Sequence, residues 1–182
     1  MAALLEATLL VDGYNIIGAW TDLALCRDRD GLAAAREALV NELANYSAFQ
    51  GYRTRLIFDA HQRRESSGSS ETVTDSLEIV YTEFGETADT HIEQFCAQAR
   101  FQIKAAQHRL IVATNDRAQQ LTVVGYGAEW MSAQQLICDI EAIGLRIRRK
   151  QKSQSKSRTR LLSHALDPAA QKKLEKWRHG LG

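Results

Sequence analysis

The sequence predicts an α/β protein: a three-layer α/β/α sandwich with a central, mostly parallel sheet, plus a basic C-terminal helical extension. Two observations predict this fold class. Short apolar runs, several of them ending near an aspartate, alternate along the chain with segments whose apolar residues recur at helical spacing. Strands that alternate with helices are joined by right-handed crossovers, which place helices on both faces of a parallel sheet. The 182 residues suffice for one domain with a substantial core.

Five short apolar runs are the predicted strands. The run TLLVD ends in Asp12, and TRLIFDA and RLIVATND have the same form, ending near Asp59 and Asp116. LEIVYT (77–82) and AEWMS (128–132) are the fourth and fifth candidates. Apolar runs of this length, bounded by polar residues, are typical of strands buried on both faces of a sheet.

Three segments have helical signals between and after these runs. Residues 31–51 carry apolar side chains at steps of three and four, and Gly51 is placed to end the helix. Residues 87–107 show the same spacing through Ile92, Phe95, Cys96 and Ala99. A third helix is expected to begin near Ser132, where Ser-Ala-Gln-Gln resembles a capping box, and to run into the basic tail. Asp167 before Pro168 predicts the start of a short terminal helix.

Two polar stretches interrupt the pattern. Residues 61–76, HQRRESSGSSETVTDS, predict a long mobile loop because they are rich in serine and glycine and follow a strand directly. Residues 150–160, KQKSQSKSRTR, are basic and contain no acid, so they either extend the preceding helix or are disordered alone. The predicted division is a globular domain at 1–149 and a basic extension at 150–182.

The net charge of +1 hides an asymmetry along the chain. Residues 1–143 carry 11 Lys and Arg against 20 Asp and Glu, a net charge of −9, whereas residues 144–182 carry 12 against 2, a net charge of +10. A basic tail on an acidic body favours a polyanionic partner bound by the tail. A solvated basic helix is the alternative interpretation.

Several function classes find no support in the sequence. No membrane span is expected, and the N-terminus lacks a signal peptide, so a cytoplasmic location is predicted. The three scattered cysteines suit reduced thiols. The chain has no nucleophile elbow, P-loop or dinucleotide fingerprint, so no nucleotide cofactor is expected.

Four aspartates are expected to converge at one edge of the sheet. Asp12, Asp59 and Asp116 lie at or just beyond the carboxyl ends of predicted strands, and Asp89 lies in the first turn of a predicted helix. Glu86 is a further candidate. Any one of them could instead serve a turn or a helix cap. Together they would repel one another unless a cation compensates, and an all-oxygen ligand set favours Mg²⁺ or Mn²⁺ and phosphodiester hydrolysis.

The residues that carry these aspartates also resemble a known family. VDGYNI, FDA, ETADTHIE and ATNDRAQQ, from about Leu9 to about Leu136, together resemble the NYN domain, a branch of the PIN-like metal-dependent ribonucleases. More specifically, they are similar to the YacP-like proteins of bacteria and plastids, a group that includes a ribosome-associated endoribonuclease. The resemblance implies a PIN-like sandwich, an acidic Mg²⁺ or Mn²⁺ centre and endonucleolytic cleavage of RNA.

The resemblance also implies roles for individual residues. Asp12, Asp89 and Asp116 would be metal ligands and catalytic, with Asp59 as a peripheral ligand and Asn15 orienting ligand or substrate. Gly13, which lacks a Cβ, would permit a tight turn and close approach of substrate. The other expected substrate contacts are Tyr14, Thr114, Asn115, Arg63 and Arg64. Tyr14 either packs in the protein or stacks on a base. The two arginines lie in a loop that closes over RNA or, as an equally good interpretation, is a solvated linker.

The family setting makes RNA, in the form of mRNA, the expected substrate, and the ribosome the expected partner. The tail would then dock on ribosomal RNA through its basic residues, Arg146, Arg148, Arg149, Lys150, Lys152, Lys156, Arg158 and Arg160. The location would be the bacterial cytosol, or the plastid stroma if the gene is plastid-encoded.

Two other functions compete with a ribonuclease. One is a catalytically weak RNA- or ribosome-binding factor that retains the fold, although a pure binder gains nothing from clustered carboxylates that face a polyanion. The other is a phosphatase or a DNA-directed flap-type nuclease. A nucleophilic Asp-x-Asp would favour the phosphatase, but position 14 is Tyr14.

Overall fold

A six-stranded sheet forms the centre of the computed structural model, which describes residues 7–59, 68–104 and 108–165, and side chains as far as residue 152. The strand order is β3-β4-β2-β1-β5-β6. Every neighbouring pair is parallel except β3 and β4. The predicted α/β class with a mostly parallel sheet is confirmed.

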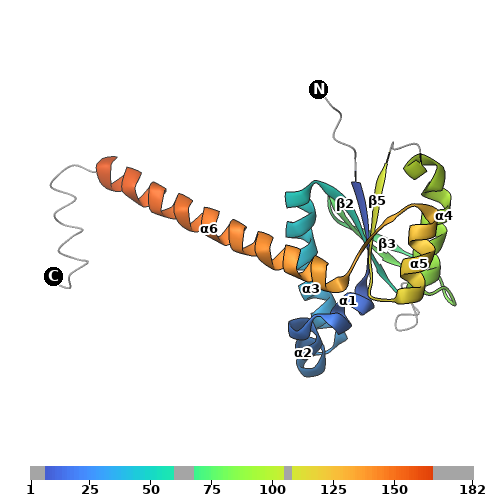
Figure 1. Ribbon diagram of the computed structural model, residues 1–182. Coiled ribbons are helices and arrows are strands. Elements are labelled where there is room, and N and C mark those ends of the chain that lie inside the picture. The colour runs from blue at the N-terminus through green and yellow to red at the C-terminus, as the bar shows by residue number, and fades with distance from the viewer. Residues whose placement is uncertain (1–6, 60–67, 105–107, 166–182) are drawn as a thin grey trace. The chain divides into compact units, whose positions relative to one another are not determined.

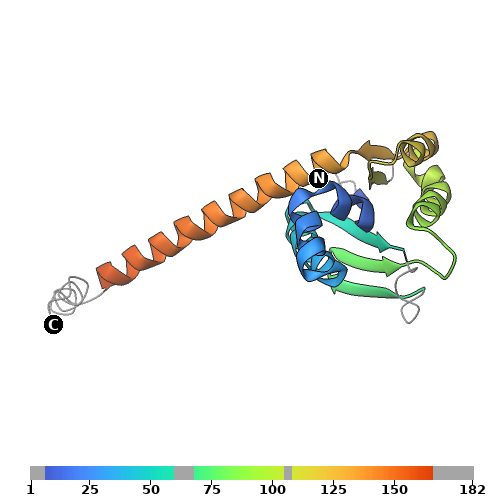
Figure 2. The same ribbon diagram turned by 90° about the horizontal axis from the view of Figure 1, so that it is seen from below.

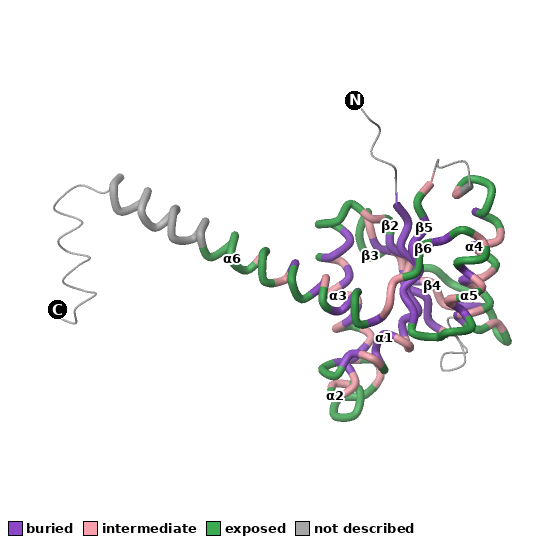
Figure 3. The backbone as a smooth tube through the Cα atoms, viewed as in Figure 1, coloured by how far each residue is buried: buried purple, intermediate pink, exposed green. Residues whose placement is uncertain are grey.

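The five predicted strands are all present. They are β1 (Ala7–Asp12), β2 (Tyr52–Phe58), β4 (Leu77–Tyr81), β5 (Arg109–Ala113) and β6 (Glu129–Met131). All six residues of β1 are buried, because β1 lies between β2 and β5 and is covered on both faces. Figure 3 shows that the buried residues concentrate in the inner strands, such as β1, β2 and β5.

The interpretation of residues 61–76 as a loop was wrong for part of the segment. Ser70–Thr74 form β3, which pairs antiparallel with β4 through a short turn. All five residues of β3 are exposed, so the strand has no alternation of apolar and polar residues that would predict it. Main-chain pairing with β4 accounts for its place in the sheet. Residues 61–67 lie outside the described part of the chain.

Helices cover both faces of the sheet. The helices α1 (Gly13–Ala19), α2 (Thr21–Asp30) and α3 (Leu32–Gln50) lie on one face, and α4 (Ala88–Lys104) and α5 (Arg117–Tyr126) lie on the other (Figures 1 and 2). Three of these, α1, α2 and α5, were not predicted. Gly51 ends α3 with φ +69, as expected for a C-terminal glycine.

The hydrophobic core beneath α4 and α5 joins residues from both helices to the sheet. Leu10, Ile57 and Val112 of the strands pack with Ile92 of α4 and Val123 of α5, and each of these side chains is buried. Burying an aliphatic side chain of this size stabilises the fold by about 1.5–3 kcal/mol. The core fixes the helices that carry Asp89 and Asp116.

The last described helix, α6 (Ala133–Ala165), begins where predicted and continues through the basic stretch. Ser132 caps its start, because the main-chain N–H of Gln135 donates to Ser132 Oγ at 3.1 Å. The chain separates into two units, residues 1–144 and 145–182, so α6 begins in the first and continues in the second. In the first unit, Ala133, Leu136 and Ile140 are buried. The expected helix after Asp167 lies outside the described residues, and no helix within them is long and apolar enough to cross a membrane.

Candidate metal centre

The carboxyl ends of the parallel strands bring the predicted aspartates to one edge of the sheet. Asp12 is the last residue of β1 and lies opposite Ile57 of β2, two residues before Asp59. Asp116 follows the end of β5, which also pairs with β1. Asp89 lies in the first turn of α4, the helix that follows β4. The register therefore places four carboxylates from four chain segments at the same edge.

Asp12 occupies the most demanding electrostatic position among them. Its side chain is only 9% exposed, and burial raises the pKa of this carboxyl to about 6. Repulsion by Asp89 and Asp59 contributes to this rise in the pKa of Asp12, whereas hydrogen bonds from the main-chain N–H groups of Asn15 and Tyr14 oppose it. The same carboxylate caps α1, because the N–H of Asn15 donates to Asp12 Oδ1 at 3.2 Å. Asp12 thus has both a structural role and a charge that the fold leaves poorly compensated.

Asp89 is coupled to the same cluster. Partial burial raises the pKa of Asp89, and the charges of Asp116, Glu93 and Asp59 raise it in turn. Gln119 of α5 donates from Nε2 to Asp89 Oδ1 at 2.7 Å, which fixes the orientation of the carboxylate. Gln119 is 2% exposed, and within the described residues its Oε1 has no hydrogen-bond partner. Gln119 therefore presents a buried acceptor beside the acidic cluster.

Asp116 combines a cluster position with a capping role. Its Oδ1 accepts from the N–H groups of Ala118 and Gln119 at 2.7 and 3.0 Å, so it is the N-cap of α5. Among the described side chains, no three His, Cys, Asp or Glu residues are arranged to hold one metal ion between them. The donors nevertheless fit Mg²⁺ or Mn²⁺ in type and charge, since such ions commonly bind one or two carboxylates and complete their coordination with water.

A hydrogen bond between Asn15 and Asn115 joins two chain segments of the site. The N–H of Asn115 donates to Asn15 Oδ1 at 2.9 Å, which joins the segments that follow β1 and β5. Asn115 Oδ1 in turn accepts from the N–H of Ala133 at 2.9 Å. Thr114 is buried, and its Oγ1 accepts from the N–H of Asp116 at 3.0 Å. These contacts position the strand ends, and a substrate contact by Asn15, Thr114 or Asn115 stays a prediction.

The packing of Phe58 requires a glycine at position 13. A Cβ at this position would lie 2.3 Å from Cε1 of Phe58, so the Phe58 ring occupies this space, and close approach of substrate to Gly13 stays a prediction. The Tyr14 ring packs on Phe58 with centroids 5.0 Å apart, which favours packing for Tyr14. Arg36 of α3 contacts both rings, donating from Nη1 to the Tyr14 hydroxyl at 3.2 Å, with its guanidinium 5.9 Å from the Phe58 centroid.

The sequence missed several residues of this region. Gln119 and Glu93 affect Asp89 directly, and Arg36 places a positive charge on Tyr14, two residues beyond Asp12. Glu93 lies one helical turn after Asp89, so helical spacing could have indicated it, whereas no local signal indicates Gln119 or Arg36. Glu86, the further candidate, instead pairs with His91 at 3.3 Å and accepts from the N–H of Glu83.

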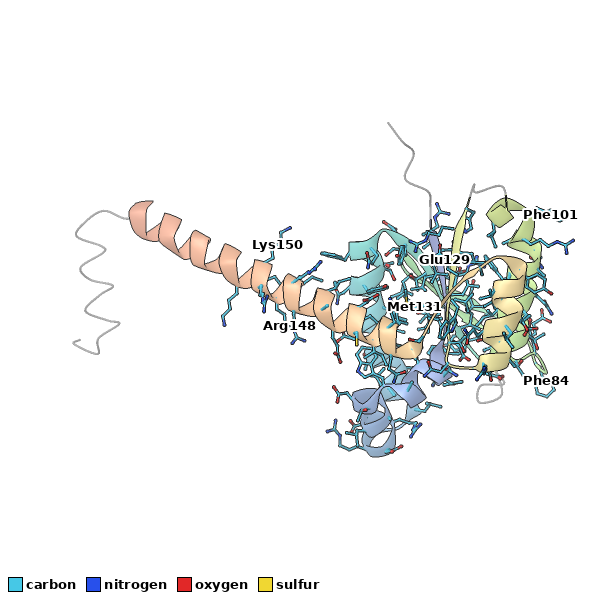
Figure 4. The ribbon with its side chains drawn as sticks, in the orientation of Figure 1. Phe84, Phe101, Glu129, Met131, Arg148 and Lys150 are labelled. Atoms are coloured by element: carbon cyan, nitrogen blue, oxygen red, sulfur yellow. The ribbon has the colours of Figure 1, made fainter. Side chains whose placement is uncertain are left out.

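The remaining predicted contacts divide between described and undescribed parts of the chain. Arg63 and Arg64 lie outside the described residues. In the second unit, Arg148, Arg149, Lys150 and Lys152 are on α6, and Arg148 and Lys150 project from the helix (Figure 4). Lys156, Arg158 and Arg160 continue the same helix, with side chains outside the described part.

Comparison with known proteins gives consistent matches. The family model described as "YacP-like NYN domain" matches residues 9–179. The protein named "Uncharacterized protein YacP" of Bacillus subtilis (strain 168) is 37% identical over 174 residues, covering 94% of this chain and 96% of that protein. The crystal structure of Rae1 (YacP) from Bacillus subtilis matches with a TM-score of 0.67 and 34% identity over 95% of each chain. A point mutant of Rae1 matches with a TM-score of 0.66 and 28% identity, over 92% of this chain and 98% of that one.

Proposed function

Because the chain belongs to the YacP-like NYN domain family, a nuclease-type family, we propose that it is a divalent-metal-dependent endoribonuclease that cleaves mRNA on the ribosome. The observation that carries the proposal is the convergence of Asp12, Asp59, Asp89 and Asp116 at one edge of the sheet, where burial and, after it, repulsion among the carboxylates raise the pKa values of Asp12 and Asp89. Such a cluster opposes folding unless a bound cation compensates its charge.

The metal is assigned from the chemistry of the donors. Asp12 and Asp89 are the residues that would hold Mg²⁺ or Mn²⁺, since both are partly buried and both are destabilised by neighbouring charges. When bound there, the cation would supply Lewis-acid stabilisation for the charge that builds up on the scissile phosphate. Gln119 holds Asp89 in place, and the link between Asn15 and Asn115 holds the segments that carry Asp12 and Asp116.

We assign RNA binding to two sets of basic groups, one near the acidic cluster and one on α6. Arg36 is held by the Tyr14 hydroxyl and the Phe58 ring, so its guanidinium is available to bind a flanking phosphate with little loss of side-chain freedom. In the second unit, Arg148, Lys152, Lys156 and Arg160 occupy every fourth position of α6, which suits binding along a phosphate backbone. Ribosomal RNA is the polyanion we propose for them, in the bacterial cytosol or the plastid stroma.

A catalytically weak RNA- or ribosome-binding factor is the second candidate. Two observations favour it. Asp12 and Asp116 each cap a helix, and the described acidic residues do not form a three-ligand site.

Cleavage of mRNA in a purified translation system with Mg²⁺ separates the two candidates. The variants are Asp12→Asn and Asp89→Asn, and Asp28→Asn, an exposed aspartate on α2, is the matched control. We expect each site variant to lose at least about a hundredfold in cleavage while all proteins co-sediment with ribosomes. If the wild type co-sediments but leaves a panel of messages intact, the binding-factor function is the correct one.

A further inference from the structure

A groove beside α4 lies outside the acidic cluster. It runs between the start of β3 and the turn that joins β4 to α4, and its volume of about 620 Å³ is within the range of small-molecule sites. The β3 side contributes Gly68–Ser70, and the opposite side contributes Tyr81, the turn residues Glu83–Glu86, and Thr90, His91 and Gln94 of α4.

The turn on one side of the groove is held by several hydrogen bonds. The N–H of Glu86 donates to the carbonyl of Glu83 at 3.0 Å, and the N–H of Glu83 donates to Glu86 Oε2 at 3.2 Å. Thr82 Oγ1 donates to the carbonyl of Glu86 at 2.8 Å. Gly85 has φ +87, a conformation that a glycine adopts without strain. A turn fixed in this way holds the residue at its tip in one place.

That residue is Phe84, whose side chain is 76% exposed and lines the groove. An exposed phenyl ring on a fixed turn offers a flat apolar surface without the entropy cost of ordering a mobile loop. Phe101, which is 69% exposed near the other end of α4, lies far from Phe84 in Figure 4. Phe101 lines none of this groove, so it is a natural comparison for Phe84.

The described polar groups that line the groove disfavour binding of a phosphate group there. Glu83 and Glu86 line it, and none of its described lining residues is a lysine or arginine. Both carboxylates repel a phosphate group, and because Glu86 already binds the N–H of Glu83 and His91, the carboxylate of Glu83 is the acceptor for an N–H donor in the groove. Gln94 adds an amide that can donate and accept. A flat apolar ring next to hydrogen-bond acceptors matches a nucleobase whose edge carries an amino group.

The groove also borders the edge that carries the carboxylates. The N–H of Thr82 donates to the carbonyl of Phe58 at 3.1 Å, and Asp59 follows Phe58. On the helix side, Thr90 lines the groove and follows Asp89 directly. A strand of RNA whose phosphate lies at the acidic edge can therefore place a neighbouring base in the groove.

From this arrangement we propose that the groove is a base-recognition subsite in which an unpaired nucleobase with an exocyclic amino group stacks on Phe84 and donates to Glu83. The proposal rests on the proposed function, because it assigns a substrate contact to the same nuclease. It predicts a preference for adenine over an otherwise similar purine that lacks the amino group.

Binding of short RNAs in EDTA tests the subsite without any cleavage. The probes are pentamers of adenosine and of purine riboside, which differ only in the exocyclic amino group. Phe84→Trp provides a fluorescent reporter at the groove, and Phe101→Trp is the matched control, with the wild-type signal of the three native tryptophans subtracted. We expect the adenosine pentamer to quench Phe84→Trp and to bind several-fold tighter than the purine riboside pentamer, with no quenching of Phe101→Trp. Equal quenching of both variants, or none at Phe84→Trp, would overturn the proposal.

Two further variants test the two halves of the site. Phe84→Ala is expected to weaken binding of the adenosine pentamer by about tenfold, the size of one base-stacking interaction, whereas Phe101→Ala leaves it unchanged. Glu83→Gln is expected to reduce the preference for adenosine over purine riboside, and it preserves the turn because the turn uses only the main chain of Glu83. Unchanged affinity in Phe84→Ala, with circular dichroism as for the wild type, contradicts the subsite. Failure of the wild type to cleave RNA contradicts the proposed function alone.

Discussion

Replacing Asp12 by asparagine is expected to make the metal-free protein more stable. The pKa of Asp12 rises from an ordinary value of 3.8 to about 6 in the folded protein, chiefly because the side chain is buried. The folded state therefore binds this proton more tightly than the unfolded chain does. The stability that this group contributes is present below pH 4 and is lost as the pH rises through 6. Above pH 6 the ionised carboxylate destabilises the fold by about 3 kcal/mol, since one pKa unit corresponds to about 1.4 kcal/mol.

Asparagine removes this charge and keeps a side-chain oxygen that can cap α1. We expect Asp12→Asn to gain about 3 kcal/mol at pH 7.5 and about 1 kcal/mol at pH 4.5, where Asp12 in the folded wild type is already protonated. Urea denaturation in EDTA at the two pH values measures both differences. Asp116→Asn is the control, because Asp116 also caps a helix but is exposed, and its change is expected to stay within about 0.5 kcal/mol.

Two results would refute this reasoning. One is an Asp12→Asn variant that is no more stable than the wild type at pH 7.5, and the other is a gain that is the same at both pH values. Addition of Mg²⁺ provides a second comparison. Because a bound cation compensates the carboxylate, Mg²⁺ is expected to raise the melting temperature of the wild type more than that of Asp12→Asn.

Three other predictions concern the core, the site and the tail. Gly13→Ala is expected to destabilise the fold by about 1–3 kcal/mol in thermal melts, because the added Cβ meets the Phe58 ring. Gly18→Ala is the control and is expected to be neutral or slightly stabilising, since no atom lies within 4 Å of its Cβ. Equal effects of the two substitutions would contradict the close packing of Phe58 on Gly13. Gln119→Met is expected to lower kcat for RNA cleavage with unchanged RNA affinity, because it releases Asp89; a loss confined to affinity would assign Gln119 to substrate binding. The third prediction replaces four basic residues of α6 by glutamine, namely Arg148, Arg149, Lys150 and Lys152. The salt dependence of ribosome binding is expected to fall by about 1 in logarithmic slope for each of these side chains that binds a phosphate. An unchanged slope would exclude the tail as the anchor.

The sequence signals that succeeded were local ones. Five apolar runs became strands, Gly51 ended α3 and Ser132 capped α6, because each signal depends on residues only a few positions apart. The signals that failed were weak or had two meanings. In α2 only Leu23 is buried, so the helix has almost no apolar stripe. Asp116 fits both a site residue at a strand end and a helix N-cap, so the start of α5 was not recognised, and its role as a ligand stays a prediction.

The site was predictable in its acidic members and not in their partners. Aspartates at strand ends mark an edge of a parallel sheet whatever the loops do, so Asp12 and Asp116 could be identified from the sequence. Gln119 could not be identified, because its contact with Asp89 depends on how α5 packs against α4. The same holds for Arg36, which reaches the site only through Tyr14 and Phe58.

The sequence by itself determined the fold class, the family, and the acidic edge of the sheet, because hydrophobic period, strand ends and short motifs are properties of neighbouring residues. Only the tertiary structure decided that β3 joins the sheet, that Phe58 fills the space beside Gly13, and that Asn15 binds the main chain of Asn115 one hundred residues away. These features depend on contacts between distant segments, and such contacts form only when the sheet brings the segments together.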